Sequence, residues 1–387
     1  MHAGPPLLAH VFPSFEVGGS QMRTARLIDG LGSEFEHALI SLSGRSEARE
    51  LLREPGRLRL LPAPRKAGTW RTSLALRRAL ADLRPALLLT YNFGALDAQI
   101  AARTLGLPAI HHEDGFGPDE ARSRKRRRNW LRRLVLPAAR AVVVPSRLLF
   151  GIAEREWGLA PPRLVHIPNG IDLERFAPGG PRADLARVGL DPGRPTVVAL
   201  GSLRPEKNLE RLIAAFEHLP ESLGAQLLIV GGGAEAQRLA ARAAASPRAA
   251  AIALAGPQAD PAPWLRACQA LALSSDTEQM PLSLVEAMAA GLPAACMDVG
   301  DVRAMLPPEQ GPLLVPCPPP GAPREAGKEA LAEALASLLA DRGRARALGQ
   351  RNLELARERY AFEAMLAAYR SLFLRHARPL RRQPAGS

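Results

Sequence analysis

The chain has 387 residues, of which 47% are hydrophobic and 23% charged, so it is long enough for two domains and has the composition of a folded globular protein rather than a disordered one. It has no apolar window of about 18 residues and no basic stretch followed by a long apolar run at its start, which predicts neither a membrane-spanning helix nor a signal peptide. The formal charge of +13 is compatible with binding to a nucleic acid, an anionic membrane or a phosphorylated substrate. An Arg-rich coding bias explains the charge equally well. Three cysteines without C-x-x-C spacing predict reduced thiols and a reducing, cytoplasmic compartment.

The first half of the chain alternates short apolar runs with helical stretches. This alternation predicts a parallel sheet covered by helices on both faces. A Pro- and Gly-rich stretch over 177–181 is typical of a linker, so we predict an N-terminal Rossmann-like domain over 1–178. The expected strands are Leu7–Phe12, His37–Leu42, Ala86–Thr90, Ala109–His112 and Ala141–Val144.

The same alternation restarts after the predicted linker and gives a second Rossmann-like domain over 185–361. Two doubly wound α/β domains of this kind bind ligands at the carboxyl ends of their strands, so we expect a site in a cleft across which the domains face each other. The expected strands are Thr196–Leu200, Leu227–Val230, Ala251–Leu254, Ala270–Leu273 and Ala294–Met297.

The stretch 274–293 follows a predicted strand and enters a helix, and it carries two glutamates eight positions apart. Glu278 lies in the turn and Glu286 within the helix. A carboxylate can accept two hydrogen bonds from neighbouring sugar hydroxyls, which is how acidic residues hold ribose and hexose rings. Taken alone, the pair is also compatible with exposed charges at a helix start.

With its continuation Ala287-Met288-Ala289-Ala290-Gly291-Leu292-Pro293, the stretch resembles the Glu-x7-Glu motif of the retaining glycosyltransferases of family four, which have the two-domain GT-B fold. The resemblance implies that Glu278 contacts the hydroxyls of the donor sugar and that Glu286 holds the ribose. It also implies a nucleotide-diphosphate sugar as co-substrate, no metal or other cofactor, and C-terminal helices, about 362–378, that cross back to the first domain. Met280, Pro281 and Leu282 belong to the same donor-binding stretch.

A second match, Gly201 to Leu209, follows a strand and opens a helix. A lysine at a helix N-terminus suits a diphosphate, because the ammonium and the positive helix end act together. In the family this lysine binds the donor phosphates, which assigns that role to Lys207. The family's usual Arg after the Gly is replaced by Ser202, so Arg204 either substitutes for it or is a surface residue. Backbone near Gln258 is expected to meet the base.

In the first half, a Gly-Gly turn between strand and helix lets backbone N–H groups approach an anion, and the resemblance places Gly18 and Gly19 next to the donor phosphates. Related enzymes carry His-Gly where this chain has Asp114-Gly115, and that His contacts the donor sugar near the reacting carbon. Either Asp114 takes its place or His112 reaches in from two residues earlier. We interpret the acidic stretch 298–301 as an ordinary loop rather than a metal site.

The segment 122–136 is the densest charge in the chain, with eight basic residues and no acidic one between 122 and 133. Trp130, Leu131, Leu134 and Val135 share roughly one helical face, which is typical of a helix lying on an anionic membrane. A solvated helix and a contact with a phosphorylated acceptor are the alternatives.

These observations predict a retaining hexosyltransferase that uses a nucleotide-sugar donor and a glycan or lipid-linked acceptor in bacterial cell-surface polysaccharide or glycolipid synthesis. We expect it in the cytoplasm, peripheral on the inner face of the membrane. The alternatives are a basic nucleic-acid-binding protein, against which stands the absence of a base-stacking aromatic series, and a same-fold epimerase or non-catalytic relative.

Overall fold

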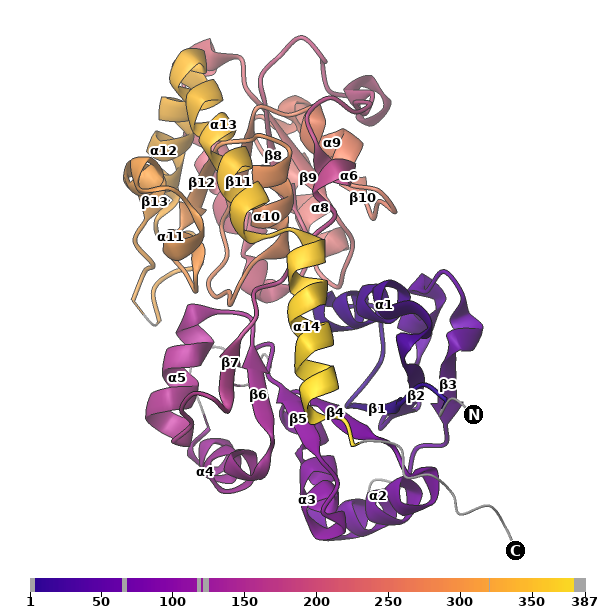
Figure 1. Ribbon diagram of the computed structural model, residues 1–387. Helices are drawn as coiled ribbons and strands as arrows, with labels where there is room; N and C mark the ends of the chain where they lie inside the picture. Colours follow the sequence, from indigo (N-terminus) through magenta and orange to yellow (C-terminus); the bar gives the residue numbers. More distant parts are fainter. Residues whose placement is uncertain (1–3, 65–67, 117–119, 121–124, 320, 379–387) are drawn as a thin grey trace, which may run out of the picture. The chain divides into compact units, whose positions relative to one another are not determined.

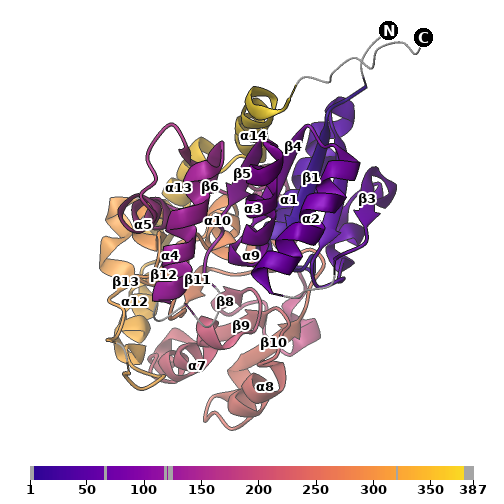
Figure 2. The same cartoon turned by 90° about the horizontal axis from the view of Figure 1, so that it is seen from below.

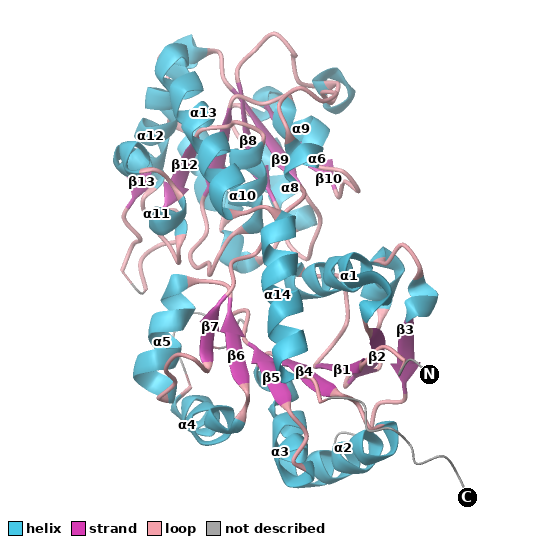
Figure 3. Ribbon diagram, viewed as in Figure 1, coloured by secondary structure: helices cyan, strands magenta, loops and turns pink. Residues whose placement is uncertain are grey.

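The computed structural model describes residues 4–64, 68–116, 120, 125–319 and 321–378 (Figure 1). The chain forms two compact units: unit 1 comprises Met1–Asn169 and Glu363–Ser387, and unit 2 comprises Gly170–Phe362. Each unit is a parallel sheet with helices packed on it (Figure 3). Within the described residues, no helix has both the length and the apolar character needed to cross a bilayer.

Unit 1 holds a seven-stranded parallel sheet in the order β3-β2-β1-β4-β5-β6-β7. Its strands are β1 (Leu7–Phe12), β2 (Glu36–Ser41), β3 (Leu58–Leu61), β4 (Leu87–Tyr91), β5 (Ala109–His112), β6 (Ala141–Val144) and β7 (Leu164–His166). Its helices are α1 (Gly19–Leu31), α2 (Thr69–Leu83), α3 (Leu96–Leu105), α4 (Arg126–Val135), α5 (Arg147–Trp157) and α14 (Phe362–His376).

Unit 2 holds a six-stranded parallel sheet in the order β10-β9-β8-β11-β12-β13. Its strands are β8 (Thr196–Leu200), β9 (Gln226–Val230), β10 (Ile252–Gly256), β11 (Ala270–Leu273), β12 (Ala294–Met297) and β13 (Leu314–Val315). Its helices are α6 (Leu173–Phe176), α7 (Leu209–Glu217), α8 (Ala236–Ala244), α9 (Ala262–Arg266), α10 (Leu282–Ala289), α11 (Val302–Met305), α12 (Lys328–Ala340) and α13 (Arg342–Arg359).

Both strand orders follow the doubly wound pattern in which the first strand lies between the second and the fourth. The prediction of two Rossmann-like α/β domains is therefore confirmed. The three strands that the sequence did not predict, β3, β7 and β13, are the short strands at or next to sheet edges, of four, three and two residues.

The two faces of the unit 1 sheet are chemically different. Alternate side chains of β1, such as Ala9 and Val11, pack in an aliphatic cluster with α2 and α3, which lie side by side in Figures 1 and 2. The opposite face carries His10 and an aromatic stack to which α14 contributes Tyr369 and Phe373. The returning C-terminal helix is thus part of the unit 1 core.

The Pro- and Gly-rich stretch 177–181 does not link the two units, because the unit boundary lies at Asn169 and Gly170. Arg266 of α9 holds this stretch inside unit 2. Its guanidinium donates to the backbone oxygens of Arg175 and Pro181 at 2.8 and 2.7 Å and lies against Gly180. Because an arginine far along the sequence supplies hydrogen-bond donors for these carbonyls, this Pro- and Gly-rich stretch is a fixed loop and not a linker.

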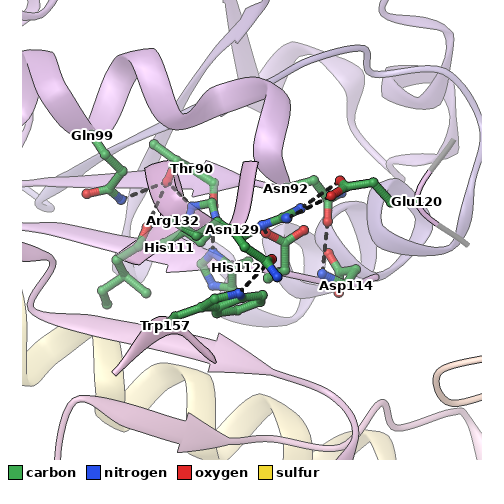
Figure 4. Close-up of polar contacts among 12 residues, drawn as sticks. Thr90, Asn92, Gln99, His111, His112, Asp114, Glu120, Asn129, Arg132 and Trp157 are labelled. Atoms are coloured by element: carbon green, nitrogen blue, oxygen red, sulfur yellow. Dashed lines mark hydrogen bonds and ion pairs between the residues drawn. The ribbon is translucent and has the colours of Figure 1, made fainter. Parts of the chain in front are cut away.

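The basic segment 122–136 is not a wholly solvated basic helix; its residues 122–124 lie outside the described part of the chain. Arg132 of α4 is completely buried and bonds to the carboxylates of Glu113 and Glu120 at 3.1 to 3.3 Å (Figure 4). Its guanidinium also lies 4.9 to 5.3 Å from the ring centroids of three aromatic side chains, those of Phe93, Phe116 and Trp157. Arg132 therefore anchors α4 to the interior of unit 1.

Glu120 shows how this ion cluster is balanced. Burial opposes its charged form, but hydrogen bonds from Arg132 and Arg128 lower its pKa below the ordinary value. Glu113 is fully buried, and its second oxygen, Oε1, accepts no hydrogen bond from the described residues. Removal of Arg132 would leave two carboxylates in a medium where unpaired charge is costly.

Buried histidines lie between the sheet and α14. His10 makes hydrogen bonds of 3.0 Å with both Tyr91 and His37, and His112 stacks between Tyr91 and Tyr369. Burial, with the neighbouring positive charge of Arg57, lowers the pKa of His37 to about 4. Burial also lowers the pKa of His10 and of His112 well below the ordinary value.

We expect unit 1 to lose stability as the pH falls from about 6.5 to about 4. In this window the unfolded chain binds protons at these histidines and the folded chain does not, so each histidine removes about 1.4 kcal/mol per pH unit. Urea denaturation of the full chain across this range measures the slope. His37→Asn keeps a hydrogen-bonding amide but cannot titrate, so it should flatten the slope; an unchanged slope contradicts the assignment to His37.

We expect Arg132→Ala to destabilise the protein by about 3–5 kcal/mol, because it leaves Glu113 and Glu120 buried without their cation. The matched control is Arg133→Ala, which removes the exposed neighbouring arginine and should cost under about 0.5 kcal/mol. Chemical denaturation of both variants measures the difference. Equal stability of the two variants would show that the cluster does not hold α4 in place.

Candidate active site

In unit 2, the sheet reverses its strand order between β8 and β11, which pair in parallel. Connections from the two strands leave toward opposite sides at such a point, so the loops at the carboxyl ends frame a binding site. The loop after β8 covers 201–208 and the loop after β11 covers 274–281; with the loop 298–301 after β12, we call them the donor loops. Lys207 and Glu278, predicted from separate motifs, lie on the first two.

The structure brings these two residues together. Lys207 Nζ donates to Glu278 Oε1 at 2.5 Å, and Ser275 Oγ donates to the same oxygen at 2.7 Å. Glu278 Oε2 accepts no hydrogen bond from the described residues, although the side chain is only 11% exposed. Because an ammonium carries three donors and a carboxylate about four acceptor sites, both groups keep capacity for a ligand.

A network behind this pair joins the first two donor loops. Arg211 of α7 is almost completely buried; it donates to the backbone oxygen of Ser274 at 2.8 Å and pairs with Asp276 at 2.8 Å. Asn208, at a left-handed φ of 44°, donates to Asp276 Oδ1 at 2.9 Å. The Lys207 carbonyl accepts from Ser274 Oγ at 2.9 Å. This network fixes Lys207 relative to Glu278, and the sequence analysis did not identify its Arg211.

The loop after β12 supports Glu278 from another side. Asp301 N donates to the Gln279 carbonyl at 3.0 Å. Gly300 has φ 59°, and a Cβ there would lie 2.3 Å from the carbonyl oxygen of Glu278, so only glycine fits. The stretch 298–301, which the sequence analysis interpreted as an ordinary loop, therefore positions the backbone of Glu278. The signal in the sequence was a glycine beside acidic residues directly after a predicted strand.

The remaining predicted residues of unit 2 lie around the same loops. Pro281 precedes α10, which begins at Leu282 and carries the half-exposed Glu286, and Met280 is buried beneath the turn. Gln258 follows β10 and donates from Nε2 to the Ala255 carbonyl at 2.7 Å. These positions follow from strand order, since β10, β11 and the start of α10 share the carboxyl edge of the sheet.

Ser202 and Arg204 are the residues that the sequence analysis considered for a second phosphate contact. Ser202 and Lys207 both line a small pocket of about 20 Å³ at the carboxyl end of β8. Arg204 has a 56% exposed side chain and lies 4.0 Å from Glu206 Oε1. Its guanidinium thus lies on the solvent side of the turn, as the surface alternative anticipated.

In unit 1, α1 begins at Gly19 directly after β1 and its loop, with Gly18 as the preceding extended residue. No acidic side chain occupies the first turn, so the positive end of α1 is unopposed there. Gln21 Nε2 ties the turn to the Ser14 carbonyl at 2.9 Å. Gly18 and Gly19 therefore lie at a helix end suited to an anion.

Asp114 lies at the carboxyl end of β5, held by Arg23 of α1. Arg23 donates from both terminal nitrogens to the two Asp114 oxygens, the longer bond being 3.1 Å, and donates to Asn169 Oδ1 at 3.0 Å. Asp114 N donates to Asn92 Oδ1 at 2.8 Å (Figure 4). Burial disfavours the Arg23 charge, but the Asp114 carboxylate outweighs it and raises the pKa of Arg23. Arg23 was not identified from the sequence.

His112 occupies a different environment. It is 1% exposed, stacks on Tyr91 and Tyr369, and hydrogen-bonds through Nδ1 with the Thr90 carbonyl at 3.3 Å. Asp114 is 17% exposed. Of the two predicted alternatives, Asp114 is therefore the side chain that is open to a ligand, whereas His112 packs in the aromatic core.

Two family models and one curated relative match most of the chain. Residues 17–175 match the family described as Glycosyltransferase Family 4, and residues 182–354 match Glycosyl transferases group 1. The chain is 30% identical over 279 residues to a GDP-mannose-dependent alpha-mannosyltransferase of Mycobacterium tuberculosis, covering 68% of each protein.

Solved structures share the fold along nearly the whole chain. Sucrose-phosphate synthase of Thermosynechococcus elongatus has a TM-score of 0.77 at 21% identity and covers 95% of this chain and 98% of that one. HepE of Anabaena, in complex with UDP, has a TM-score of 0.77 at 15% identity, with 95% and 99% covered.

Other curated relatives align over shorter stretches. The chain spans only 21% of an exopolysaccharide phosphotransferase of Streptomyces coelicolor and 37% of a D-inositol 3-phosphate glycosyltransferase of Segniliparus rotundus. The alpha-mannosyltransferase, by contrast, is matched over two thirds of its length, and the two family matches leave little of the chain unassigned. The chain therefore belongs to the glycosyltransferases of group 1 and has their GT-B fold.

Proposed function

We propose that this glycosyltransferase retains the anomeric configuration, as family four enzymes do, and moves a hexose-type sugar from a nucleotide-diphosphate sugar to a glycan or lipid-linked acceptor. The product belongs to cell-surface polysaccharide or glycolipid synthesis on the cytoplasmic side of the membrane. The observation that carries the proposal is the 2.5 Å contact between Lys207 and Glu278, the residues to which we assign the donor phosphates and the donor sugar.

The donor fits this pair without displacing it. Lys207 has two donors left for the diphosphate, and Glu278 Oε2 can accept hydrogen bonds from sugar hydroxyls. Glu286, eight positions after Glu278 and within α10, holds the ribose, and backbone near Gln258 contacts the base. With the Arg204 side chain turned to solvent, the second phosphate contact falls to backbone N–H groups near Ser202.

The reaction needs positioning more than a nucleophile. In front-face transfer, the bond from the sugar to the diphosphate breaks as the acceptor oxygen attacks from the same side, and the departing phosphate takes the acceptor's proton. Lys207 stabilises the negative charge that develops on the leaving group, and Asp114, fixed by Arg23, orients the reacting sugar. Such a scheme uses no metal and no covalent enzyme intermediate.

We propose that α4 rests on an anionic membrane. Trp130 and Leu134 are 64% and 55% exposed, and Arg126, Arg127 and Arg133 are exposed around them. Exposed aromatic and aliphatic side chains beside arginines suit the headgroup region of a bilayer. A nucleic-acid partner is not proposed, because the same segment commits Arg132 to the interior and has no stacking series.

The donor class is testable by thermal unfolding with UDP, GDP, ADP and CMP and their sugars. A ligand at 100 times its dissociation constant adds about 2.7 kcal/mol of stability. The alpha-mannosyltransferase relative is named for GDP-mannose and HepE was solved with UDP, so we expect a shift with GDP or UDP. A response to no nucleotide would count against transfer and favour a non-catalytic relative.

We expect Glu286→Ala to weaken nucleotide-sugar binding about tenfold, through loss of hydrogen bonds to a charged group. Glu278→Ala should instead lower turnover by about tenfold to a hundredfold with a smaller change in nucleotide affinity. Glu309→Ala, at an exposed glutamate of unit 2, is the control and should change neither. Calorimetric titration with the nucleotide and single-turnover product analysis separate the two effects; the reverse pattern would exchange the two roles.

A further inference from the structure

A pocket of about 1210 Å³ opens in unit 1 beside α4. It is lined from the start of α2, from α3 and α4, and from the loops after β4 and β5. Ligand pockets for drug-sized molecules measure roughly 300–1,000 Å³. The pocket therefore has room for more than a single sugar ring, and the donor loops of unit 2 contribute nothing to it.

Much of the pocket wall is apolar, and the buried polar side chains of Gln99, Glu120 and Arg132 line the rest of its interior. The apolar walls belong to the cluster packed around the buried Trp157, and α3 packs against both α2 and α4 around them. The lining side chains from this cluster are Phe93, Leu96, Ile100, Phe116, Leu131 and Val135. Walls of this kind bind hydrocarbon well and offer few partners for hydroxyl groups.

Three large apolar side chains remain in water at the same pocket. Trp70 is 83% exposed, Trp130 64% and Leu134 55%, and all three line it. Scattered exposed apolar residues are ordinary, but three gathered on one apolar pocket mark a binding surface. An apolar chain running out of the pocket would cover them.

The charge of the pocket is uneven. Of the described lining side chains five are basic and three acidic. Two of the acidic ones are already neutralised: Asp114 by Arg23, and Glu120 by Arg128 and Arg132. Arg103 and Arg127 are exposed, line the pocket, and form no ion pair with the described residues. They are available for an anion, which guanidinium groups bind through paired N–H donors.

The pocket also reaches the residues assigned to the transfer reaction. Asn92 and Asp114, joined by a 2.8 Å hydrogen bond at the carboxyl ends of β4 and β5, line it. One continuous space thus connects polar strand ends, unpaired guanidinium groups and apolar walls. A molecule that carries a sugar or hydroxyl, a phosphate and a hydrocarbon chain matches all three.

We propose that this pocket is the acceptor site and that the acceptor is a lipid phosphate: a hydrocarbon chain joined through phosphate to the group that receives the sugar. The hydrocarbon chain packs on the aromatic and aliphatic walls, and the phosphate binds Arg103 and Arg127. The inference rests on the transferase function proposed above and goes further than surface contact of α4 with a bilayer, since it assigns a defined pocket to one lipid-type molecule.

The test uses 11-bromoundecyl phosphate, whose bromine quenches nearby tryptophan, with 11-bromoundecanol and inorganic phosphate as comparison probes. We expect the full chain to bind the alkyl phosphate saturably at one molecule per chain, with quenching that Trp70→Phe and Trp130→Phe reduce. Arg103→Ala and Arg127→Ala should each weaken binding about tenfold, the loss of a charge-assisted hydrogen bond. All four residues have exposed side chains, so these variants should fold.

Arg126→Ala and Arg133→Ala are the matched controls, because both arginines are exposed on α4 and neither lines the pocket. They should change binding less than about twofold. Equal weakening by all four arginine variants would mean diffuse attraction to a charged surface and would overturn the pocket. Equal binding of the alcohol and the phosphate, or quenching without saturation, would overturn it as well.

A nucleotide thermal shift on the same samples separates this inference from the proposed function. A nucleotide shift without alkyl phosphate binding leaves the transferase proposal standing and removes only the lipid phosphate acceptor. Loss of both would remove the transferase proposal too.

Discussion

The reversal of strand order in each sheet is the constraint on which the chemistry of this enzyme depends. Parallel strands end at one edge, and only where the order reverses do their connections part and leave the strand ends open. In unit 2 this point lies between β8 and β11, and it brings Lys207 and Glu278, 71 positions apart, into hydrogen-bond contact. In unit 1 the corresponding point lies between β1 and β4, where Arg23 of α1 meets Asp114 after the adjoining β5. The same topology therefore yields a charged pair at the strand ends of each unit.

The ion pairs of the protein differ in how many hydrogen-bond donors and acceptors they leave free for a ligand. This difference distinguishes side chains that can bind a ligand from side chains that only stabilise the fold. The planar guanidinium of Arg132 bonds to two carboxylates and contacts three aromatic rings in a fully buried site, so it cannot bind a ligand. Lys207 spends one of three donors, and Glu278 uses one oxygen of two. An arginine whose donors are all used stabilises the fold, whereas a lysine with free donors can bind a ligand and its carboxylate partner at once.

Local patterns in the sequence were sufficient for the central strands and for the positions of Lys207 and Glu278 in the loops that follow them. Buried parallel strands are continuous apolar runs, and the Glu278 and Lys207 stretches directly follow two of these runs. The edge strand β3 has one buried residue in four, without alternation, and β13 has only two residues, so neither has a readable period. Arg23, Arg132, Arg211 and Arg266 were missed for one reason: an arginine is buried only where distant carboxylates or carbonyls pair with it, and sequence spacing does not reveal those partners. The stretch 177–181 was misjudged as a linker because its Arg266 lies about 85 positions away.

Helix α4 shows how a buried charge can set the character of a surface. Its apolar side chains occupy neighbouring positions on the helix, yet Val135 is buried and Trp130 and Leu134 remain in water. Rotation of the helix to bury the tryptophan would draw Arg132 away from Glu113 and Glu120, and uncompensated buried charge costs about 3–5 kcal/mol. Burial of exposed apolar surface returns only about 25 cal/mol per Å², so the ion cluster outweighs it over a contact of ordinary size. The helix is therefore held in one rotation, and the apolar, arginine-lined rim of the pocket is a consequence of the charges beneath it.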